Sequence, residues 1–418
     1  MSLTANWNYP TSIRFGVGRI AELAEICRSQ GIERPLLVTD SGLARAPITT
    51  AALDALRAAG LGVALFCDLK PNPVEANLAG GLDAWRAGKH DGVVAFGGGS
   101  GLDMGKLIAF MSGQTRPVWD FEDIGDYWTR ADESRIAPVI AVPTTAGTGS
   151  EVGRAAVIID EGTHTKRIIF HPKMMPRVVI SDPTLSVGMP AKVTAGTGMD
   201  AFSHCLEAYC APGFHPMAEG IAVEGMRLVA NALVRAVHMP SDLEARGQML
   251  AAAAMGATAF QKGLGGMHAL AHPIGALYDT HHGMTNATLM PYVLKFNRPA
   301  IEERITRLAA WLRLPSPGFD SFLAFVLKLR KDIGVPHTLF ELGVDDRQAD
   351  LIADMAVVDP SAGGNPLPLT RAGAAEIFDA AALLGQFACG FGHAVPLAVE
   401  AIAGVAHFAL VILDAVLE

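Results

Sequence analysis

The second half of the chain contains an aspartate and several histidines at the spacing of metal ligands. Asp200 and His204 stand four residues apart in GMDAFSHCLEAY, a segment that predicts a helix, so both side chains are expected on one helix face. Four further histidines follow in GMHALAHPIGALYDTHHG: His268, His272, His281 and His282. His268 and His272 again stand four residues apart. Each histidine alone would more often be structural, but two pairs at this spacing in apolar helices, where an unpaired imidazole is costly, favour a divalent transition-metal site. The spacing leaves open which of the four histidines bind.

Two glycine-containing turns in the first half are candidates for binding a phosphorylated cofactor. FGGGSGLD, residues 96–103, follows a predicted strand and opens a helix, an arrangement that gathers bare backbone N–H groups at the positive end of the helix dipole. It matches neither the GxGxxG nor the Walker A pattern, so an ordinary tight turn is the alternative. PTTAGTGSE, residues 143–151, follows another strand. Two such turns at adjacent strand ends predict one extended ligand, and a dinucleotide has that length.

Asp40 stands at the end of the first predicted strand of the α/β region, in LLVTDSGL. In that position its carboxylate would accept hydrogen bonds from a ribose diol and repel a 2′-phosphate, which favours NAD over NADP. The alternative is a helix N-cap before Gly42, and the sequence leaves both interpretations open.

The elements that must position these residues differ between the two parts of the chain. Up to about residue 185, β-branched apolar runs alternate with helical stretches: PLLVT, GVALF, GVVAF and PVIAV. This alternation predicts βα units around a mostly parallel sheet, with a hairpin between residues 154 and 171. From about residue 190 the chain is rich in Ala, Leu and Met with helical periodicity. We therefore predict an α/β NAD-binding domain at 1–185 and a helical metal- and substrate-binding domain at 186–418.

Composition narrows the class of protein. The 418 residues are 50% hydrophobic and carry a formal charge of -9, the wrong sign for attraction to nucleic acid or anionic lipid. Five cysteines without a CxxC motif argue against a disulfide framework, and with no secretory signal at the start they predict a cytoplasmic protein. The apolar tail at 390–418 is interrupted by Glu400 and Asp414, which favours a buried or interface helix over a membrane span.

Several separate segments together resemble the iron-containing (group III) alcohol dehydrogenase family, over about residues 5 to 384. They are FGVG at 15–18, VTDSGL, GGGSGLDMGK, PTTAGTGSEV, GMDAFSHCLEAY and GMHALAHPIGALYDTHHG. The resemblance implies a Rossmann-like α/β domain followed by an all-α domain, the architecture that dehydroquinate synthase shares. It also implies NAD(P)-linked interconversion of alcohols and aldehydes by a homodimer or a larger homo-oligomer.

The resemblance assigns roles to individual residues. The metal ligands that it implies are Asp200, His204, His268 and His282, with Fe2+ as the expected ion and Zn2+ as the alternative. His272 would lie beside the nicotinamide without binding the metal, where it is the candidate catalytic residue for proton transfer. The residues implied to bind NAD are Asp40, Gly97, Gly98, Gly99, Ser100, Asp103, Thr144, Thr145, Thr148 and Lys166. His281 is a departure, since many members have proline there.

The expected substrate is a small alcohol or aldehyde. Phe260 and Lys262 precede His268 and are candidate substrate residues. The Lys262 ammonium would favour an anionic semialdehyde or hydroxy acid, unless it is solvated and selects nothing. An alternative with the same fold is an NAD- and metal-dependent lyase similar to dehydroquinate synthase, which needs several basic residues for its substrate. A metal hydrolase would leave both glycine turns and Asp40 unexplained.

Overall fold

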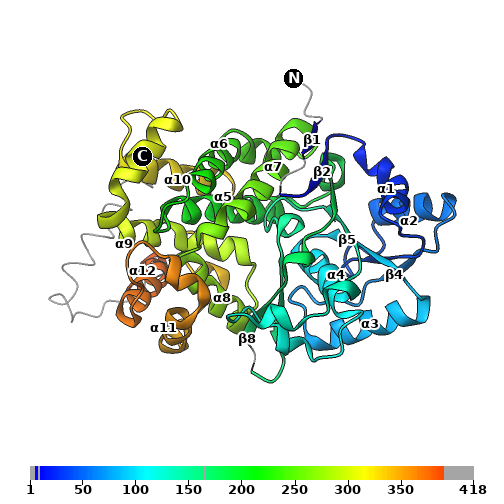
Figure 1. Ribbon diagram of the computed structural model, residues 1–418. Coiled ribbons are helices and arrows are strands. Elements are labelled where there is room, and N and C mark those ends of the chain that lie inside the picture. The colour runs from blue at the N-terminus through cyan, green and yellow to red at the C-terminus, as the bar shows by residue number, and fades with distance from the viewer. Residues whose placement is uncertain (1–4, 8–9, 164, 390–418) are drawn as a thin grey trace. The chain divides into compact units, whose positions relative to one another are not determined.

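The computed structural model describes residues 5–7, 10–163 and 165–389 (Figure 1). The tail at 390–418, with its predicted buried or interface helix, lies outside the described residues. Packing divides the chain into two compact units. The sheet unit comprises Met1–Cys205 and Met217–Gln261, and the helical unit comprises Leu206–Pro216 and Lys262–Glu418.

The sheet unit contains a seven-stranded sheet in the order β1-β2-β9-β6-β5-β3-β4, parallel except for the pair β1 and β2. Its strands are β1 (Ala5–Trp7), β2 (Ser12–Phe15), β3 (Pro35–Val38), β4 (Ala64–Phe66), β5 (Gly92–Gly97), β6 (Val139–Pro143) and β9 (Val178–Ser181). The four runs predicted as strands are β3 to β6, and the parallel α/β architecture is confirmed. Val93, Val94 and Phe96 of β5, an interior strand of the sheet, are fully buried, as expected for a parallel strand covered on both faces.

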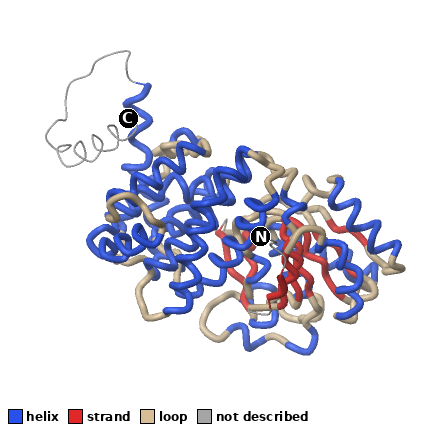
Figure 2. Tube along the Cα trace, turned by 90° about the horizontal axis from the view of Figure 1, so that it is seen from above, coloured by secondary structure: helices blue, strands red, loops and turns tan. Residues whose placement is uncertain are grey.

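Helices accompany this sheet, as Figure 2 shows in blue beside the red strands. They are α1 (Leu23–Ser29), α2 (Pro47–Ala58), α3 (Glu75–Gly88) and α4 (Gly99–Met111). Nearly every residue of α4 after its first turn is buried, because the helix packs between β5, α3 and the predicted hairpin. That hairpin is present as a separate two-stranded sheet of β7 (Ala155–Asp160) and β8 (Thr165–Phe170).

Three helices that follow the sheet in sequence also pack largely in the sheet unit: α5 (Ala191–Cys210), α6 (Pro216–His238) and α7 (Leu243–Ala259). The contacts that hold α5 and α7 there involve glycines. A Cβ on Gly147 would lie 2.8 Å from the Cβ of Thr197 in α5, and a Cβ on Gly149 would overlap Ala257 in α7. Gly149 also has a positive φ of 62°, a conformation that glycine adopts without strain. The domain boundary near residue 185 remains a prediction.

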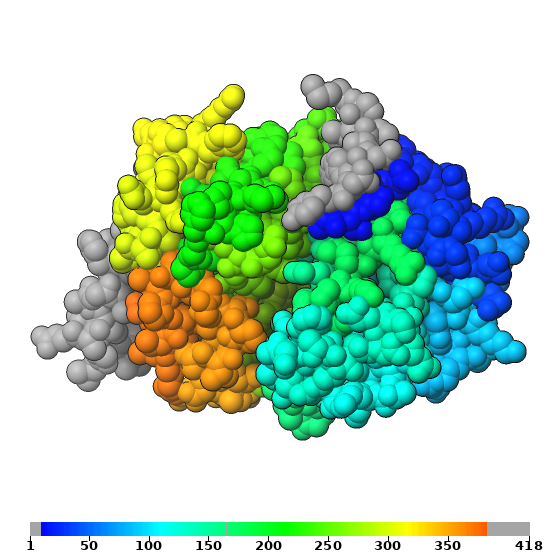
Figure 3. Space-filling model, in the orientation of Figure 1, coloured from blue at the N-terminus to red at the C-terminus, as the bar shows by residue number. Residues whose placement is uncertain are grey.

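The helical unit is formed by the last turn of α5 together with α8 (Gly266–Tyr278), α9 (His282–Trp311), α10 (Phe319–Asp332), α11 (Ala349–Val358) and α12 (Arg371–Cys389). Its mostly helical character confirms the prediction for the second half of the chain. In this unit α9 packs against α8, α10 and α12. Leu351 and Val358 of α11 are exposed. Figure 3 shows the surface of this part of the chain in orange. Among the residues that the structure describes, no helix combines the length and apolar character that crossing a membrane requires.

Candidate active site

The first glycine turn links β5 to α4 and faces the second turn. Gly98 is the N-cap of α4, so the N–H groups of the first helical turn have no partner within the helix. A Cβ on Gly98 would lie 3.3 Å from Oγ1 of Thr145, and a Cβ on Gly99 would lie 2.7 Å from Cγ2 of Thr148. Glycine therefore allows the two turns to approach closely. Their juxtaposition follows from the pairing of Gly97 with Pro143 at the ends of neighbouring parallel strands.

The sequence offered a helix N-cap before Gly42 as one role of Asp40, but residues 41–45 form a turn and α2 begins only at Pro47, so Asp40 caps a turn instead. Its Oδ1 accepts hydrogen bonds from the backbone N–H groups of Gly42 at 2.9 Å and Leu43 at 3.0 Å. Its Oδ2 lies 3.8 Å from the position that a Cβ on Gly97 would take. One oxygen thus stabilises the turn after β3 while the other lies beside Gly97, the first glycine of the turn between β5 and α4.

Asp103, predicted to line the cofactor, contacts other groups of the protein. Its Oδ2 accepts from the N–H of Val157 at 2.9 Å, and its Oδ1 accepts from the hydroxyl of Ser150 and lies 3.2 Å from Nζ of Lys106. Nζ of Lys106 also donates to the carbonyls of Ser150, at 3.0 Å, and Ala155. These bonds connect α4 to the end of the second turn and to β7.

Two buried charges accompany this contact, and the sequence analysis did not single out either. Lys106 is 1% exposed and Glu151 is 2% exposed. Burial lowers the pKa of the Lys106 ammonium, and the negative charges of Asp103 and Glu151 oppose that shift. Burial raises the pKa of Glu151 to about 7, against the opposing effect of Lys106. The sequence did contain a signal for this ion pair, since Lys106 stands in an otherwise apolar predicted helix three residues after Asp103.

Two further residues predicted to bind the cofactor, Thr144 and Lys166, differ in burial. Thr144 is buried, and its N–H donates to the carbonyl of Gly97 at 2.9 Å, which ties the second turn to the first. Lys166 lies in β8, paired in register with Ile159, and is half-buried.

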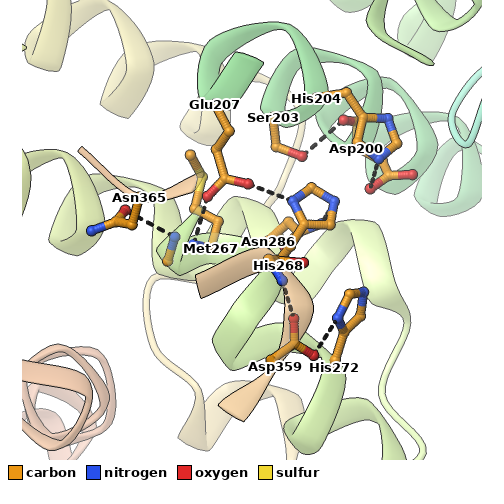
Figure 4. Close-up of polar contacts among 12 residues, drawn as sticks. Asp200, Ser203, His204, Glu207, Met267, His268, His272, Asn286, Asp359 and Asn365 are labelled. Carbon is orange, nitrogen blue, oxygen red and sulfur yellow. Dashed lines mark hydrogen bonds and ion pairs between the residues drawn. The ribbon is translucent and has the colours of Figure 1, made fainter. Parts of the chain in front are cut away.

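Asp200 and His204 lie on α5 as predicted, and both are buried (Figure 4). Nε2 of His204 is 3.9 Å from Oδ1 of Asp200. The ring of Phe260, a predicted substrate residue, packs edge-on against the His204 ring with 5.1 Å between centroids. A Cβ on Gly256 in α7 would lie 3.0 Å from the Cβ of His204, so α7 approaches this face of α5 closely.

The helical unit groups three of the four other histidines. The ring centroids of His268 and His282 are 5.1 Å apart, and His272 stacks on His282 at 5.4 Å with an interplanar angle of 9°. Nδ2 of Asn286 lies 3.2 Å from Nε2 of His268 and 3.1 Å from Nε2 of His282. The Nε2 atoms of these two histidines therefore point at the same amide group.

The other two histidines have different partners. Nδ1 of His272 lies 2.9 Å from Oδ2 of Asp359, in the bend that precedes the short helix Pro360–Gly364. His281 is the N-cap of α9, and its Nδ1 accepts from the N–H of Met284 at 3.4 Å. Of these four histidines, His268 and His282 are the two whose Nε2 atoms lie within 3.2 Å of the Asn286 amide nitrogen.

Comparison with known proteins identifies the family. The iron-containing alcohol dehydrogenase model matches residues 10–183, and the model of the C-terminal region of this family matches residues 194–382. The 4-hydroxybutyrate dehydrogenase of Cupriavidus necator is 40% identical over 86% of this chain and 94% of its own length. The chain belongs to the iron-containing alcohol dehydrogenase family. Membership makes it an NAD-dependent oxidoreductase of alcohols and aldehydes that uses a divalent metal ion.

Solved structures of alcohol dehydrogenases in this family share the fold. The crystal structure of 1,3-propanediol oxidoreductase superposes with a TM-score of 0.84 at 35% identity, covering 91% of this chain and 100% of that one. The sulfoacetaldehyde reductase of Bifidobacterium kashiwanohense, solved in complex with NAD+, gives a TM-score of 0.81 at 27% identity over 91% and 99% of the two chains. These relatives are dehydrogenases and reductases, which leaves the lyase and hydrolase alternatives without support.

Two acidic residues of the dehydrogenase escaped the sequence analysis. Glu207 contacts His268 through Oε2 and Nδ1, 2.6 Å apart, and Asp359 contacts His272. Burial would raise the pKa of Asp359, but hydrogen bonding and the charge of His272 hold it below the ordinary value. Glu207 follows His204 by three residues on α5, a spacing that the sequence displays, whereas Asp359 lies 87 residues from its histidine and had no local signal.

Lys262, the other predicted substrate residue, is half-buried in the short helix Phe260–Lys262. Its Nζ donates to the carbonyl of Tyr209 at 3.4 Å, and Nη1 of Arg304 donates to the same oxygen at 3.0 Å. The two cationic side chains thus share one backbone acceptor. Both charges lie near Cys210, whose thiol has its pKa raised to about 12 by burial.

Proposed function

We propose that the enzyme interconverts short primary alcohols and aldehydes with NAD(H), at a divalent ion held by Asp200, His204, His268 and His282. The observation that carries this assignment is the pair of Nε2 atoms of His268 and His282 aimed at one amide. The buried pair of Asp200 and His204 on α5 supplies a carboxylate oxygen and an imidazole nitrogen. One carboxylate with three imidazoles suits Fe2+ or Zn2+.

The continuity of α5 supports a single ligand set. His204 and Glu207 are three residues apart in one helix and therefore share a helix face. Glu207 in turn contacts His268. When bound, the ion would act as a Lewis acid on the substrate oxygen. The protein's part is to hold that oxygen in place and to keep Nε2 of His268 and His282 directed at the ion.

For NAD we propose the turns Gly97–Ser100 and Thr144–Thr148, with Asp40 at the ribose and Lys166 nearby. Bound NAD(H) carries the hydride, and these residues position it. The bare N–H groups at the start of α4 suit a pyrophosphate. Asp103 fits a positioning role better than a direct contact, since its carboxylate already accepts from Ser150 and Val157.

His272 is the proposed proton carrier. Its ring stacks on His282, and its side chain is 26% exposed. Asp359 engages Nδ1, so that Nε2 is the nitrogen left to exchange a proton with substrate or solvent. The carboxylate fixes the orientation of the ring.

Replacing Asp40 with asparagine is expected to raise kcat/KM for NADPH roughly tenfold, because removing one charge near a 2′-phosphate relieves repulsion of about 1 kcal/mol or more. Asparagine retains an Oδ1 that accepts from Gly42 and Leu43, so the turn should survive and the melting temperature should barely change. Steady-state kinetics with both cofactors measures the ratio. An unchanged preference would leave Asp40 with its capping role alone.

We further propose that the substrate carries an anionic group distant from the reacting carbon, and that Lys262 selects it. The support is the Lys262 ammonium on the segment between Phe260 and His268, together with the 4-hydroxybutyrate dehydrogenase among the relatives. An ammonium–carboxylate hydrogen bond contributes about 1.5–3 kcal/mol.

Replacing Lys262 with methionine should therefore lower kcat/KM for 4-hydroxybutyrate by about 10- to 100-fold. With 1-butanol, which carries a methyl group in place of the carboxylate, the change should stay within about twofold. Kinetics with this matched pair measures both changes. Equal losses for both alcohols would show that Lys262 is structural.

We also propose that the protein is a cytoplasmic homodimer. β1 lies at one edge of the seven-stranded sheet, and an edge strand can be extended by a strand from a second copy of the chain. The resemblance to a family that often dimerises through its N-terminal strands supports the same arrangement.

A further inference from the structure

Glu207 binds two neighbouring groups in the first turn of α8. Its Oε1 accepts from the N–H of Met267 at 2.7 Å, and its Oε2 lies 2.6 Å from Nδ1 of His268 (Figure 4). Glu207 is 5% exposed and His268 is 1% exposed. Because a carboxylate only accepts hydrogen bonds, the proton of a neutral His268 ring lies on Nδ1 and the lone pair on Nε2.

The side-chain amide of Asn365 binds another N–H group in the first turn of α8. Oδ1 of Asn365 accepts from the N–H of Gly266 at 3.0 Å and from Nδ2 of Asn297 at 2.8 Å. Gly265, the N-cap of α8, has no side chain to cap the helix, and a Cβ there would lie 3.0 Å from Asn365 and 3.1 Å from Glu207. Two acceptors from other elements thus replace the usual capping side chain.

A His268 ring protonated on Nδ1 is consistent with the contacts of its other nitrogen, Nε2. Nε2 of His268, as an acceptor, suits the Nδ2 donor of Asn286 at 3.2 Å. The same amide nitrogen lies 3.1 Å from Nε2 of His282. An acceptor at each Nε2 is the state that a metal ligand requires.

We propose that Glu207 is a positioning residue that fixes the tautomer and the ring orientation of His268, so that Nε2 is presented to the metal ion. Because one carboxylate also binds the N–H of Met267, ring orientation and the start of α8 are set by the same group. The inference rests on the proposed ligand role of His268. Outer partners of this kind typically change metal affinity 10- to 100-fold when mutated.

Glu207→Gln is the decisive variant because it preserves size while exchanging one oxygen for an NH2 donor. If the amide oxygen faces Met267, the NH2 faces Nδ1 of His268 and favours a proton on Nε2. If the amide is reversed, two donors meet at the N–H of Met267 and the cap is lost. We expect the first orientation, because it keeps the hydrogen bond from the N–H of Met267 and gives the NH2 group an acceptor at Nδ1 of His268.

The matched control is Asn365→Ala. It removes the acceptor for the N–H of Gly266 at the same helix end but leaves the contact between Glu207 and His268 intact. A general loosening of α8 would therefore appear in both variants, whereas a tautomer effect would appear in Glu207→Gln alone.

The experiment combines two measurements. Long-range 1H–15N spectra of the metal-free protein, labelled at histidine, report which ring nitrogen of His268 carries the proton. Competition with a chelator measures the affinity for Zn2+ and Co2+. We expect a proton on Nδ1 in the wild type, a shift toward Nε2 in Glu207→Gln, and a 10- to 100-fold loss of metal affinity in that variant only.

A proton on Nε2 in the metal-free wild type would overturn the inference without any variant. An equal loss of affinity in Asn365→Ala would also overturn it, since Glu207 would then act only through the helix. His268→Ala tests the proposed function separately: unchanged metal affinity there would remove His268 from the ligand set, while the tautomer measurement would still report the role of Glu207.

Discussion

Replacing His282 with alanine is expected to lower kcat/KM for aldehyde reduction by on the order of 10³-fold, because the loss of Lewis-acid stabilisation is a loss of several kcal/mol. The variant should also lose metal during dialysis, since two Nε2 atoms share the amide of Asn286 and only one would remain. Metal content and kinetics, measured on the same preparation, test both statements.

The neighbouring residue provides the control for this substitution. His281 is exposed, and its Nδ1 caps α9 by accepting from the N–H of Met284. His281→Ala should keep metal and activity and cost about 1 kcal/mol of stability at most, the usual value of a helix cap. Equal loss of metal in both variants would contradict the ligand assignment.

Replacing Lys106 with methionine is expected to destabilise the fold by about 3–5 kcal/mol, the usual cost of removing one partner of a buried ion pair. The variant leaves Asp103 and Glu151 without a cation, and it leaves the carbonyls of Ser150 and Ala155 without their donor. Because these bonds hold the second cofactor turn, the dissociation constant of NADH should also rise. Urea unfolding and a fluorescence titration with NADH measure the two effects.

The control for Lys106 is the same substitution at Lys173, whose ammonium forms a 2.8 Å ion pair with the exposed Glu133. An exposed pair of this kind contributes about 0–1 kcal/mol, so Lys173→Met should be nearly neutral. A comparable loss in both variants would mean that the buried pair contributes no more than a surface one.

The stability of the fold should depend on pH through the same cluster. The pKa of Glu151 is raised from 4.5 to about 7 in the folded state. Between these values the unfolded chain binds fewer protons at this group, so its contribution to stability falls as pH rises, by on the order of 3 kcal/mol in total. Glu151→Gln should flatten the unfolding free energy between pH 5 and about pH 7. An unchanged slope in that variant would assign the pH dependence to other groups.

Local sequence signals predicted the strands of the sheet and the position of the first glycine turn. Each of the strands β3 to β6 is a short apolar run between turn residues, and a parallel sheet places the turns after β5 and β6 side by side whatever the rest of the chain does. The placement of Asp200 and His204 on one helix face could also be predicted, because both residues lie in the single helix α5. Such features can be predicted because they depend only on the residue pattern within one helix or strand.

Contacts between distant segments could not be predicted in the same way. Glu207 meets His268 across 61 residues, and Asp103 meets Val157 in a hairpin whose position depends on tertiary packing. His281 caps α9 and His282 is its first residue, so their roles depend on where the helix begins. If α9 began one residue later, His282 would be the capping residue. Asp40 had two local interpretations because capping and ribose binding require the same carboxylate.

The central claim is tested most directly by NADH oxidation with short aldehydes, using protein reconstituted anaerobically with Fe2+ beside a chelator-treated portion. We predict turnover in the reconstituted enzyme, its loss on chelation, and its return when Fe2+ or Zn2+ is restored. NADH binding would persist throughout, because the glycine turns lie apart in sequence from all four proposed ligands. Equal turnover before and after chelation would contradict the metal-dependent mechanism.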